Sequence, residues 1–81
     1  MRMLVIGGIY RHFKGKLYMA LHVAEHTETG EKLVVYMALY GDNKIWVRPY
    51  NMFMSEVDRK KYPEALQEHR MEYIGDIWME G

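Results

Sequence analysis

The side chains that could do chemistry in this chain gather first near its amino end. Tyr10-Arg11-His12-Phe13-Lys14 interleaves aromatic and basic residues, a pattern that suits base stacking with phosphate contacts on single-stranded nucleic acid. The same residues fit a strand with an inward-facing Phe13 that leads into a solvated basic turn. Nonspecific nucleic-acid binding needs a clear basic excess, whereas 11 basic and 11 acidic residues give a net charge of zero. The charge balance therefore favours the strand and turn over a nucleic-acid surface.

A second candidate group lies in the middle of the chain. Trp46 and Arg48 are two residues apart, so on a strand they project from the same face, beside Met37. An exposed tryptophan beside an arginine is typical of a binding anchor. A core tryptophan with an arginine stem lying along it fits equally well, as does an Arg48 paired with Glu28 or Asp58. The sequence leaves these interpretations open.

The histidine spacing does not predict a metal site. His22 and His26 are four residues apart, which would chelate zinc from one face of a helix. On a strand, four residues span about 13 Å, too far for one ion. His26-Thr27-Glu28 imitates the HxE of zinc deaminases, but the PCxxC half is missing and the chain has no cysteine. We therefore expect no metal and no cofactor.

Catalytic residues are equally sparse. Ser55 is the single serine, and no nucleophile motif surrounds it. His12 could meet Asp42 or Asp58 only if the fold brought them together. A small enzyme, or a subunit of one, would need a concave pocket that holds a histidine with a perturbed pKa. The sequence favours a non-enzymatic protein.

The elements that must position these residues are short strands. Two apolar runs flank Gly41-Asp42-Asn43-Lys44, which predicts a hairpin over 33–49. If Gly41 and Lys44 close the turn, Tyr40 lies opposite Ile45 and Met37 opposite Arg48. In that register Tyr36 and Ala38 share one face with Ile45 and Val47, and Trp46 lies on the other face. Further strands are expected at 3–6, 9–13, 17–24 and 67–74, and helical turns at 50–54 and 58–62. Gly30 is expected to adopt a positive φ.

This pattern predicts a mainly β fold, a small SH3-like β-barrel or roll with one short helical insertion before the last strand. Eighty-one residues with 49% hydrophobic content suit a single domain over 1–81. The apolar run after Arg2 is too short for a signal peptide or a membrane span. We expect a cytoplasmic protein that does not contact a membrane.

Several segments resemble one bacterial family. They are YRHFKG at 10–15, Tyr18, Ala24-x-His26-x-Glu28, VVYMALYGD at 34–42 and IWVRPYNMF at 45–53. In this order and spacing they resemble the family catalogued as domain of unknown function 1653, over residues 7–74. The resemblance implies a small SH3-like roll and no particular chemistry. The GDIWMEG ending departs from the family pattern, so 75–81 is a tail of uncertain role.

The leading hypothesis is a binding module that recognises a protein segment or a small polar ligand through rim loops at 11–16, 25–31 and 41–44. A nucleic-acid-binding domain that uses the 11–16 loop, and a small enzyme, are the alternatives. The apolar stretch Ile77–Met79 suggests homodimerisation through the tail. The residues expected to bind are Arg11, His12, Lys14, His26, Glu28, Tyr40, Trp46 and Arg48.

Overall fold

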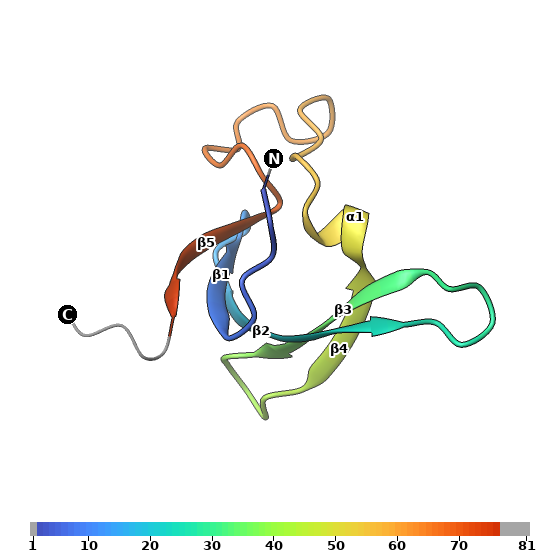
Figure 1. Cartoon of the computed structure of the whole chain (residues 1–81). Helices are drawn as coiled ribbons and strands as arrows, with labels where there is room; N and C mark the ends of the chain where they lie inside the picture. The colour runs from blue at the N-terminus through green and yellow to red at the C-terminus, as the bar shows by residue number, and fades with distance from the viewer. Residues whose placement is uncertain (1, 77–81) are drawn as a thin grey trace.

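The structure, a computed structural model, describes residues 2–76 (Figure 1). It contains β1 (Gly8–His12), β2 (Leu17–Glu25), β3 (Lys32–Ala38), β4 (Ile45–Pro49), α1 (Tyr50–Phe53) and β5 (Met71–Asp76). The strands form one antiparallel sheet in the order β4-β3-β2-β1-β5. The predicted mainly β class, with one short helix before the last strand, is confirmed. No helix within these residues is long and apolar enough to span a membrane.

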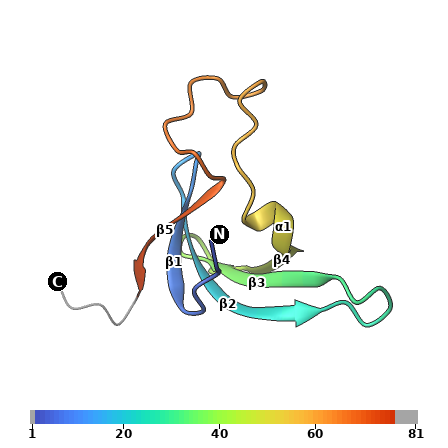
Figure 2. The same cartoon turned by 45° about the horizontal axis from the view of Figure 1, so that its top comes forward.

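The sheet bends along β2 and buries its inner face. The pairing of β2 with β3 shifts between Ala20 and His22, and such a bulge bends a strand (Figures 1 and 2). Phe53 of α1 packs edge-on against Tyr10 at 5.4 Å and Tyr36 at 5.2 Å between ring centres. The helix turn thus closes the core over the bent sheet. The core cluster consists of Tyr10, Tyr18, Ala20, Val34, Tyr36, Ala38, Phe53 and Met71.

The predicted hairpin forms, but the predicted register is wrong. Met37 lies opposite Ile45 and Tyr36 opposite Trp46, a shift of three residues from the predicted pairing. The connection is longer than expected because the backbone N–H of Ala38 donates to the carbonyl of Lys44 at 2.9 Å. A shift by an odd number of residues exchanges the faces of a strand. Trp46 therefore shares the inner face with Tyr36, whereas Met37 lies on the outer face.

The amino-terminal segment is not the strand predicted at 3–6. The N–H of Leu4 donates to the hydroxyl of Tyr50 at 3.3 Å, and the N–H of Val5 donates to the hydroxyl of Tyr10 at 2.9 Å. Arg2 donates to the carbonyl of Met71 at 3.0 Å and so reaches β5. Side-chain contacts of this kind satisfy the segment's backbone without a strand partner. It runs across the inner side of the sheet (Figure 1).

The segment between α1 and β5 also differs from expectation. Instead of a helix at 58–62 there is one turn, in which the N–H of Tyr62 donates to the carbonyl of Asp58 at 2.8 Å. The strand predicted at 67–74 pairs with β1 only from Met71 onward. His69 makes an isolated bridge with Glu56 instead. The alternation of side chains therefore predicted extended chain correctly but placed the start of the strand too early.

Candidate ligand-binding site

Four aromatic side chains meet on the inner face of the sheet, near the β3–β4 turn. The ring centre of Tyr18 lies 5.5 Å from that of Tyr36, 5.5 Å from that of Tyr40 and 6.3 Å from that of Trp46. Tyr36 and Trp46 are 6.2 Å apart. These separations are within the range at which aromatic rings attract one another. We call Tyr18, Tyr36, Tyr40 and Trp46 the aromatic cluster.

Strand pairing explains how the cluster forms. Tyr18 lies opposite Ala38 and Tyr36 opposite Ala20, so each large ring faces a small side chain across the β2–β3 ladder. Diagonal neighbours on one face of a sheet are within reach of aromatic side chains. The two tyrosines therefore lean toward each other over the alanines. Trp46 then joins them from the neighbouring strand, opposite Tyr36.

The cluster has a buried base and an open edge. Tyr18 and Tyr36 are buried, whereas Trp46 is 41% exposed and Tyr40 is half-buried. A hollow of about 230 Å³ lies beside the two outer rings; it is lined by Ala38, Tyr40, Gly41, Asp42, Lys44 and Trp46. A rigid aromatic base with an exposed tryptophan can contact a ligand at a low cost in side-chain entropy.

Two tyrosine hydroxyls of the cluster are hydrogen-bonded to each other. The oxygens of Tyr18 and Tyr40 are 2.7 Å apart. Burial and this hydrogen bond raise the pKa of Tyr18 to about 12. At neutral pH the site therefore presents a neutral Tyr18 phenol, which can exchange hydrogen bonds but cannot act as a base.

Basic side chains surround His12 at the edge of the cluster. The His12 ring stacks on Phe13 at 4.6 Å and lies 6.4 Å from Tyr18. Burial, followed by the positive charges of Arg48, Arg70 and Lys14, lowers the pKa of His12 to about 4. His12 is therefore neutral at physiological pH, and its Nδ1 accepts the backbone N–H of Lys14 at 3.1 Å. The positive charges that add to the effect of burial would attract an anion.

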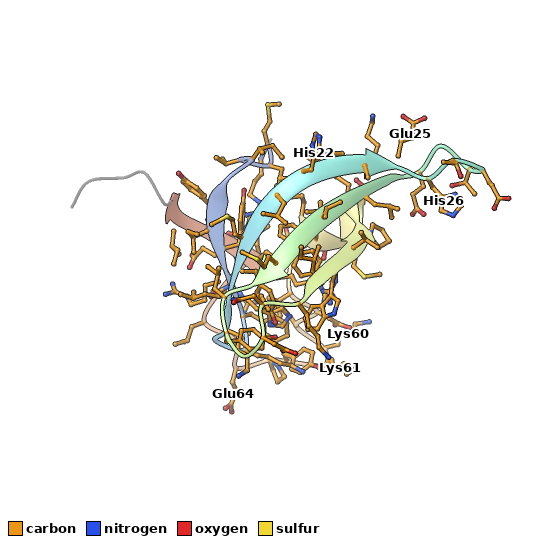
Figure 3. All side chains as sticks on the ribbon, turned by 90° about the horizontal axis from the view of Figure 1, so that it is seen from below. His22, Glu25, His26, Lys60, Lys61 and Glu64 are labelled. Atoms are coloured by element: carbon orange, nitrogen blue, oxygen red, sulfur yellow. The ribbon has the colours of Figure 1, made fainter. Side chains whose placement is uncertain are left out.

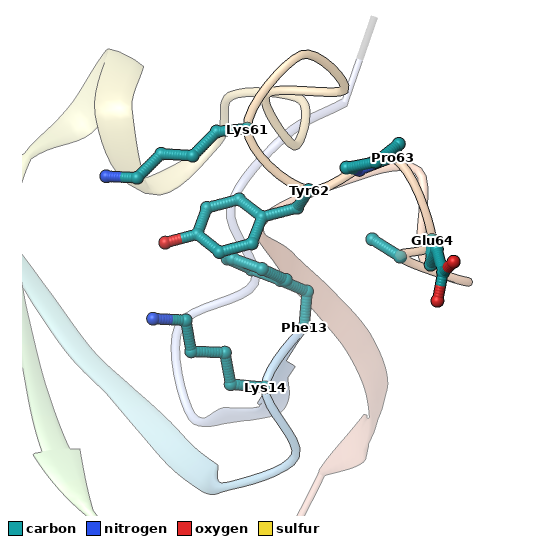
Figure 4. Close-up of a pocket in the computed structure, with 7 residues that line it drawn as sticks. Phe13, Lys14, Lys61, Tyr62, Pro63 and Glu64 are labelled. Atoms are coloured by element: carbon teal, nitrogen blue, oxygen red, sulfur yellow. The ribbon is translucent and has the colours of Figure 1, made fainter.

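A second and larger hollow adjoins Phe13. It has a volume of about 450 Å³ and is lined by Phe13, Lys14, Lys61, Tyr62, Pro63, Glu64 and Ala65 (Figure 4). The rings of Phe13 and Tyr62 pack edge-on at 4.8 Å. The Nζ atoms of Lys14 and Lys61 lie 5.1 and 5.6 Å from the centre of the Tyr62 ring. The turn after β1 is thereby joined to the loop before β5.

Lys16 lies beside the aromatic cluster. Its Nζ lies 4.5 Å from the ring centre of Tyr40, in cation–π contact. We call Lys14, Lys16, Arg48 and Lys61 the basic rim. The acidic tip of the β2–β3 hairpin, which includes Glu25, projects away from the end of the molecule that carries Lys61 (Figure 3). Zero net charge therefore hides a separation of positive and negative charge.

Comparison with known proteins places the chain in a family. The family described as "Protein of unknown function (DUF1653)" matches residues 8–73. This chain belongs to that family. The crystal structure of a protein belonging to DUF1653 from Bordetella bronchiseptica is similar, with a TM-score of 0.74 and 33% sequence identity over 94% of this chain and 95% of the other. A search of curated proteins gave no match.

The DUF1653 fold brings five of the eight predicted site residues together, although Arg48 pairs with Val34 and so lies nearer the β2–β3 turn than the others. His12, Lys14, Tyr40, Trp46 and Arg48 all lie in or beside the aromatic cluster and the basic rim. Tyr40 and Arg48 are half-buried and Trp46 is exposed, so the surface on which the prediction depends is accessible. The fold thus gathers these five residues from three separate segments of the chain.

The other three predicted residues lie elsewhere in the DUF1653 domain. Arg11 forms an ion pair with Glu72 at 2.7 Å and hydrogen-bonds to Gln67. His26 and Glu28 lie in the β2–β3 turn, where the Nδ1 of His26 accepts the N–H of Glu28 at 3.1 Å. The expectation that the 25–31 loop adjoins the 11–16 and 41–44 loops is therefore wrong (Figure 3). The two ends of a long antiparallel hairpin cannot meet.

The predicted binding residues omit several contributors to the site, namely Lys16, Tyr18, Tyr36, Lys61 and Tyr62. Tyr18 had a detectable signal, because strand alternation in β2 places it on the same face as the buried Ala20. Lys61 and Tyr62 had none, because they lie in an irregular loop whose position depends on tertiary contacts. Lys14 and Tyr62 are in contact although they are far apart in the sequence.

The described residues contain one group with metal-ligand geometry. Ligand atoms of Glu56, Glu68 and His69 lie within 4.8 Å of one another, at the isolated bridge before β5. Both glutamates are exposed, and exposed carboxylates often cluster without a metal. His22 and His26 lie on and just after β2, so the strand interpretation of their spacing is correct.

Ser55 is not arranged as a nucleophile. Its hydroxyl donates to the carbonyl of Met52 at 2.7 Å and accepts from the Nε of Arg70 at 3.4 Å. A general base would have to accept the hydroxyl proton, and an arginine cannot do so. Hydrolysis through this serine therefore has no support in the arrangement.

Proposed function

We propose that this DUF1653 domain is a non-enzymatic binding module. It recognises a protein segment or a small polar ligand with anionic character, through the aromatic cluster and the basic rim. The observation that carries the proposal is the gathering of an exposed Trp46, a half-buried Tyr40 and the cationic side chains of the basic rim around neutral His12. Tryptophan, tyrosine and arginine are the residue types that dominate binding energy at interfaces.

The architecture supports this proposal. The strand order β4-β3-β2-β1-β5, with a short helix between β4 and β5, supports an SH3-like roll, in which loops at one end of a rigid sheet are free to recognise ligands. The family description names no activity, and its crystallised member comes from a bacterium. A bacterial, cytoplasmic binding module is consistent with these features.

The test is a screen of short peptides and polar fragments against the isotopically labelled chain. Binders should shift the backbone amide signals of Lys14, Tyr40 and Trp46. Trp46→Ala and Arg48→Gln should each weaken the best binder by about tenfold or more, as expected for an anchor worth at least about 1.4 kcal/mol. Changes in amide signals across a titration give the affinity and the site together.

Val47→Ala is the matched control for these two variants. Val47 lies between them on β4, is 58% exposed, and faces the outer side of the sheet. It should leave affinity unchanged. Binders whose shifts cluster on the outer face or at the β2–β3 turn would contradict the assignment of the site.

A nucleic-acid-binding domain is the second candidate, because Phe13 and Tyr62 pair with Lys14 and Lys61 as aromatic and cationic partners. A salt titration with a mixed single-stranded oligonucleotide decides between the two. A steep loss of affinity as the salt concentration rises would support the nucleic-acid-binding domain. Failure to bind at low salt would eliminate it.

A further inference from the structure

The hollow between Phe13 and Tyr62 has the features of an anion site with an apolar wall. Figure 4 shows the ammonium groups of Lys14 and Lys61 on either side of the Tyr62 hydroxyl, at one end of the hollow. The carboxylate of Glu64 lies at the other end, away from both lysines. Three donors therefore converge where an anion could sit, while the aromatic rings extend beneath it.

The positive charge at this point is not neutralised by nearby carboxylates. Within residues 2–76, neither Lys14 nor Lys61 has a carboxylate oxygen within 4.0 Å. Hydrogen bonding with Lys14, together with the charges of Lys14 and Lys61, lowers the pKa of the Tyr62 phenol. The two lysines thus already favour negative charge on an oxygen at this position.

The loop that carries Lys61 is held in place by its own contacts. The Oδ1 of Asp58 accepts the N–H of Lys60 at 3.0 Å, and the guanidinium of Arg59 donates to the carbonyls of Ala65 and Gln67. Phe13 is fixed from the other side, because its N–H donates to the carbonyl of Arg70 at 2.9 Å. Two separate turns therefore present the donors from defined positions, which lowers the entropy cost of binding.

We propose that this hollow binds the phosphate monoester group of a small ligand, with the ring or apolar part of that ligand lying against Phe13 and Tyr62. This inference rests on the proposed function and specifies the ligand class of one part of the same rim. A phosphate monoester carries close to two negative charges at neutral pH, which matches two lysines, whereas a carboxylate carries one. Lysine binds phosphate as a point charge and needs no bidentate geometry.

Three probes separate the contributions of charge and ring. Phenyl phosphate carries a ring and a dianion, benzoate a ring and a monoanion, and inorganic phosphate no ring and, at a pH of about 8 or above, a dianion like that of phenyl phosphate. Titration calorimetry and amide shifts should show phenyl phosphate binding about tenfold more tightly than either of the others. Shifts should centre on Phe13, Lys14 and Tyr62.

Variants of the two lysines test the assignment to residues. Lys14→Gln and Lys61→Gln should each weaken phenyl phosphate binding about three- to fivefold, the effect of losing one partly solvated charge contact. Lys32→Gln is the matched control, since Lys32 is exposed at the far end of β3 and should change nothing. Tyr62→Phe retains the ring and removes the third donor, so it should weaken binding less than either lysine variant.

The pH dependence gives a second signature. Affinity for phenyl phosphate should rise between about pH 5 and pH 7.5, because the second pKa of a phosphate monoester is about 6. Affinity for benzoate should stay level over that range. The groups that face the hollow are Lys14, Lys61, Tyr62 and Glu64, with His12 behind Phe13. His12 has a pKa of about 4 and stays neutral, and the rise should persist in Glu64→Gln.

Three results would overturn the proposal. They are benzoate binding as tightly as phenyl phosphate, inorganic phosphate binding as tightly as phenyl phosphate, and affinity that is unaffected by both lysine variants. Any of them, combined with peptides that shift Trp46 in the screen above, would remove the phosphate site and leave the binding module intact. If none of the three probes binds and the screen finds no binder, both proposals are wrong.

Discussion

His12 illustrates how one residue can report on the charge of its surroundings. Its ring is half-buried between Phe13 and Tyr18, so burial first and the nearby charges of Arg48, Arg70 and Lys14 second lower its pKa and keep it neutral in the folded protein. The unfolded chain would protonate it at the ordinary pKa of 6.5. The unfolded state therefore binds more protons than the folded state between pH 6.5 and about pH 4.

This difference predicts that His12 lowers the stability of the protein as the pH falls. The free energy of unfolding should decrease from about pH 6.5 toward pH 4, by on the order of 1 kcal/mol after allowing for solvent screening of a partly exposed ring. His12→Gln keeps a polar, uncharged side chain and removes the titration. Urea denaturation of both proteins at several pH values measures the difference.

His22→Gln serves as the control, because His22 is an exposed histidine on β2. It should leave the pH dependence as it is in the parent protein. Carboxylates contribute equally to parent and variant, so they cancel in the comparison. Equal pH profiles for the parent and His12→Gln would show that the folded state does not suppress protonation of His12.

Among the elements, the turn before β1 leaves no room for a side chain at Gly8. The N–H of Gly8 donates to the carbonyl of Val5 at 2.9 Å. A Cβ at Gly8 would lie 2.8 Å from that carbonyl oxygen and 2.9 Å from the Tyr73 ring. Gly8→Ala should therefore open the turn and destabilise the protein by about 1–3 kcal/mol, the usual range for overpacking. Thermal unfolding provides the measurement.

Gly41→Ala separates steric clash from backbone strain. Gly41 has a φ of 59°, and a Cβ added there would meet no atom within 4 Å, so only its left-handed backbone resists the change. The substitution should cost about 1 kcal/mol. If Gly8→Ala costs no more than Gly41→Ala, the close approach at Gly8 is not important for stability.

Sequence patterns predicted strands well and their connections poorly. Alternation identified β3, in which Val34, Tyr36 and Ala38 are buried, and the short apolar run after Pro49 identified α1. The β3–β4 register was not predictable because Asn43 adopts a φ of 55° and donates from its side chain to the carbonyl of Ala38 at 2.9 Å. A turn stabilised in this way is longer than the spacing of glycine and lysine suggested.

The candidate site was only partly predictable, because some of its residues lie on strands and others lie in irregular loops. Although the register shift made its predicted face wrong, Trp46 can be grouped with Arg48 on one strand face from sequence alone. Tyr62 cannot be placed from sequence, because it reaches Phe13 through a loop that has no period. The ion pair of Arg11 with Glu72 was not visible in the sequence, because it depends on the pairing of β1 with β5, which are far apart along the chain.

On the scale of the whole molecule, charge is arranged along the sheet. Glu25, Glu28 and Glu31 lie at the β2–β3 turn, whereas Lys14, Lys16 and Lys61 of the basic rim lie toward the opposite end of those strands. The net charge of zero therefore does not predict the charge of the partner, because a ligand contacts only one end of the sheet. Interactions at the rim should weaken with salt even though the chain is neutral overall.

Self-association is a separate property of the whole molecule. The predicted homodimer depends on Ile77–Met79, which lie outside the described residues. The preceding strand, β5, is one edge of the sheet, and Ile74 on it is 42% exposed. An edge strand with exposed apolar side chains is a typical site of association between chains. We expect the 81-residue chain to dimerise and a chain ending at Asp76, which retains β5, to be monomeric.

Sedimentation equilibrium at several concentrations measures this difference. The full chain should show a mass that rises from 9.7 kDa toward twice that value as concentration increases. Trp78→Ala in the full chain should weaken the association if the tail side chains make the contact, whereas Lys32→Gln should not. Equal masses for the full and shortened chains at every concentration would refute a tail-mediated dimer. Concentration-dependent mass in both chains would instead assign the contact to the sheet itself, because β5 and its exposed Ile74 are present in both.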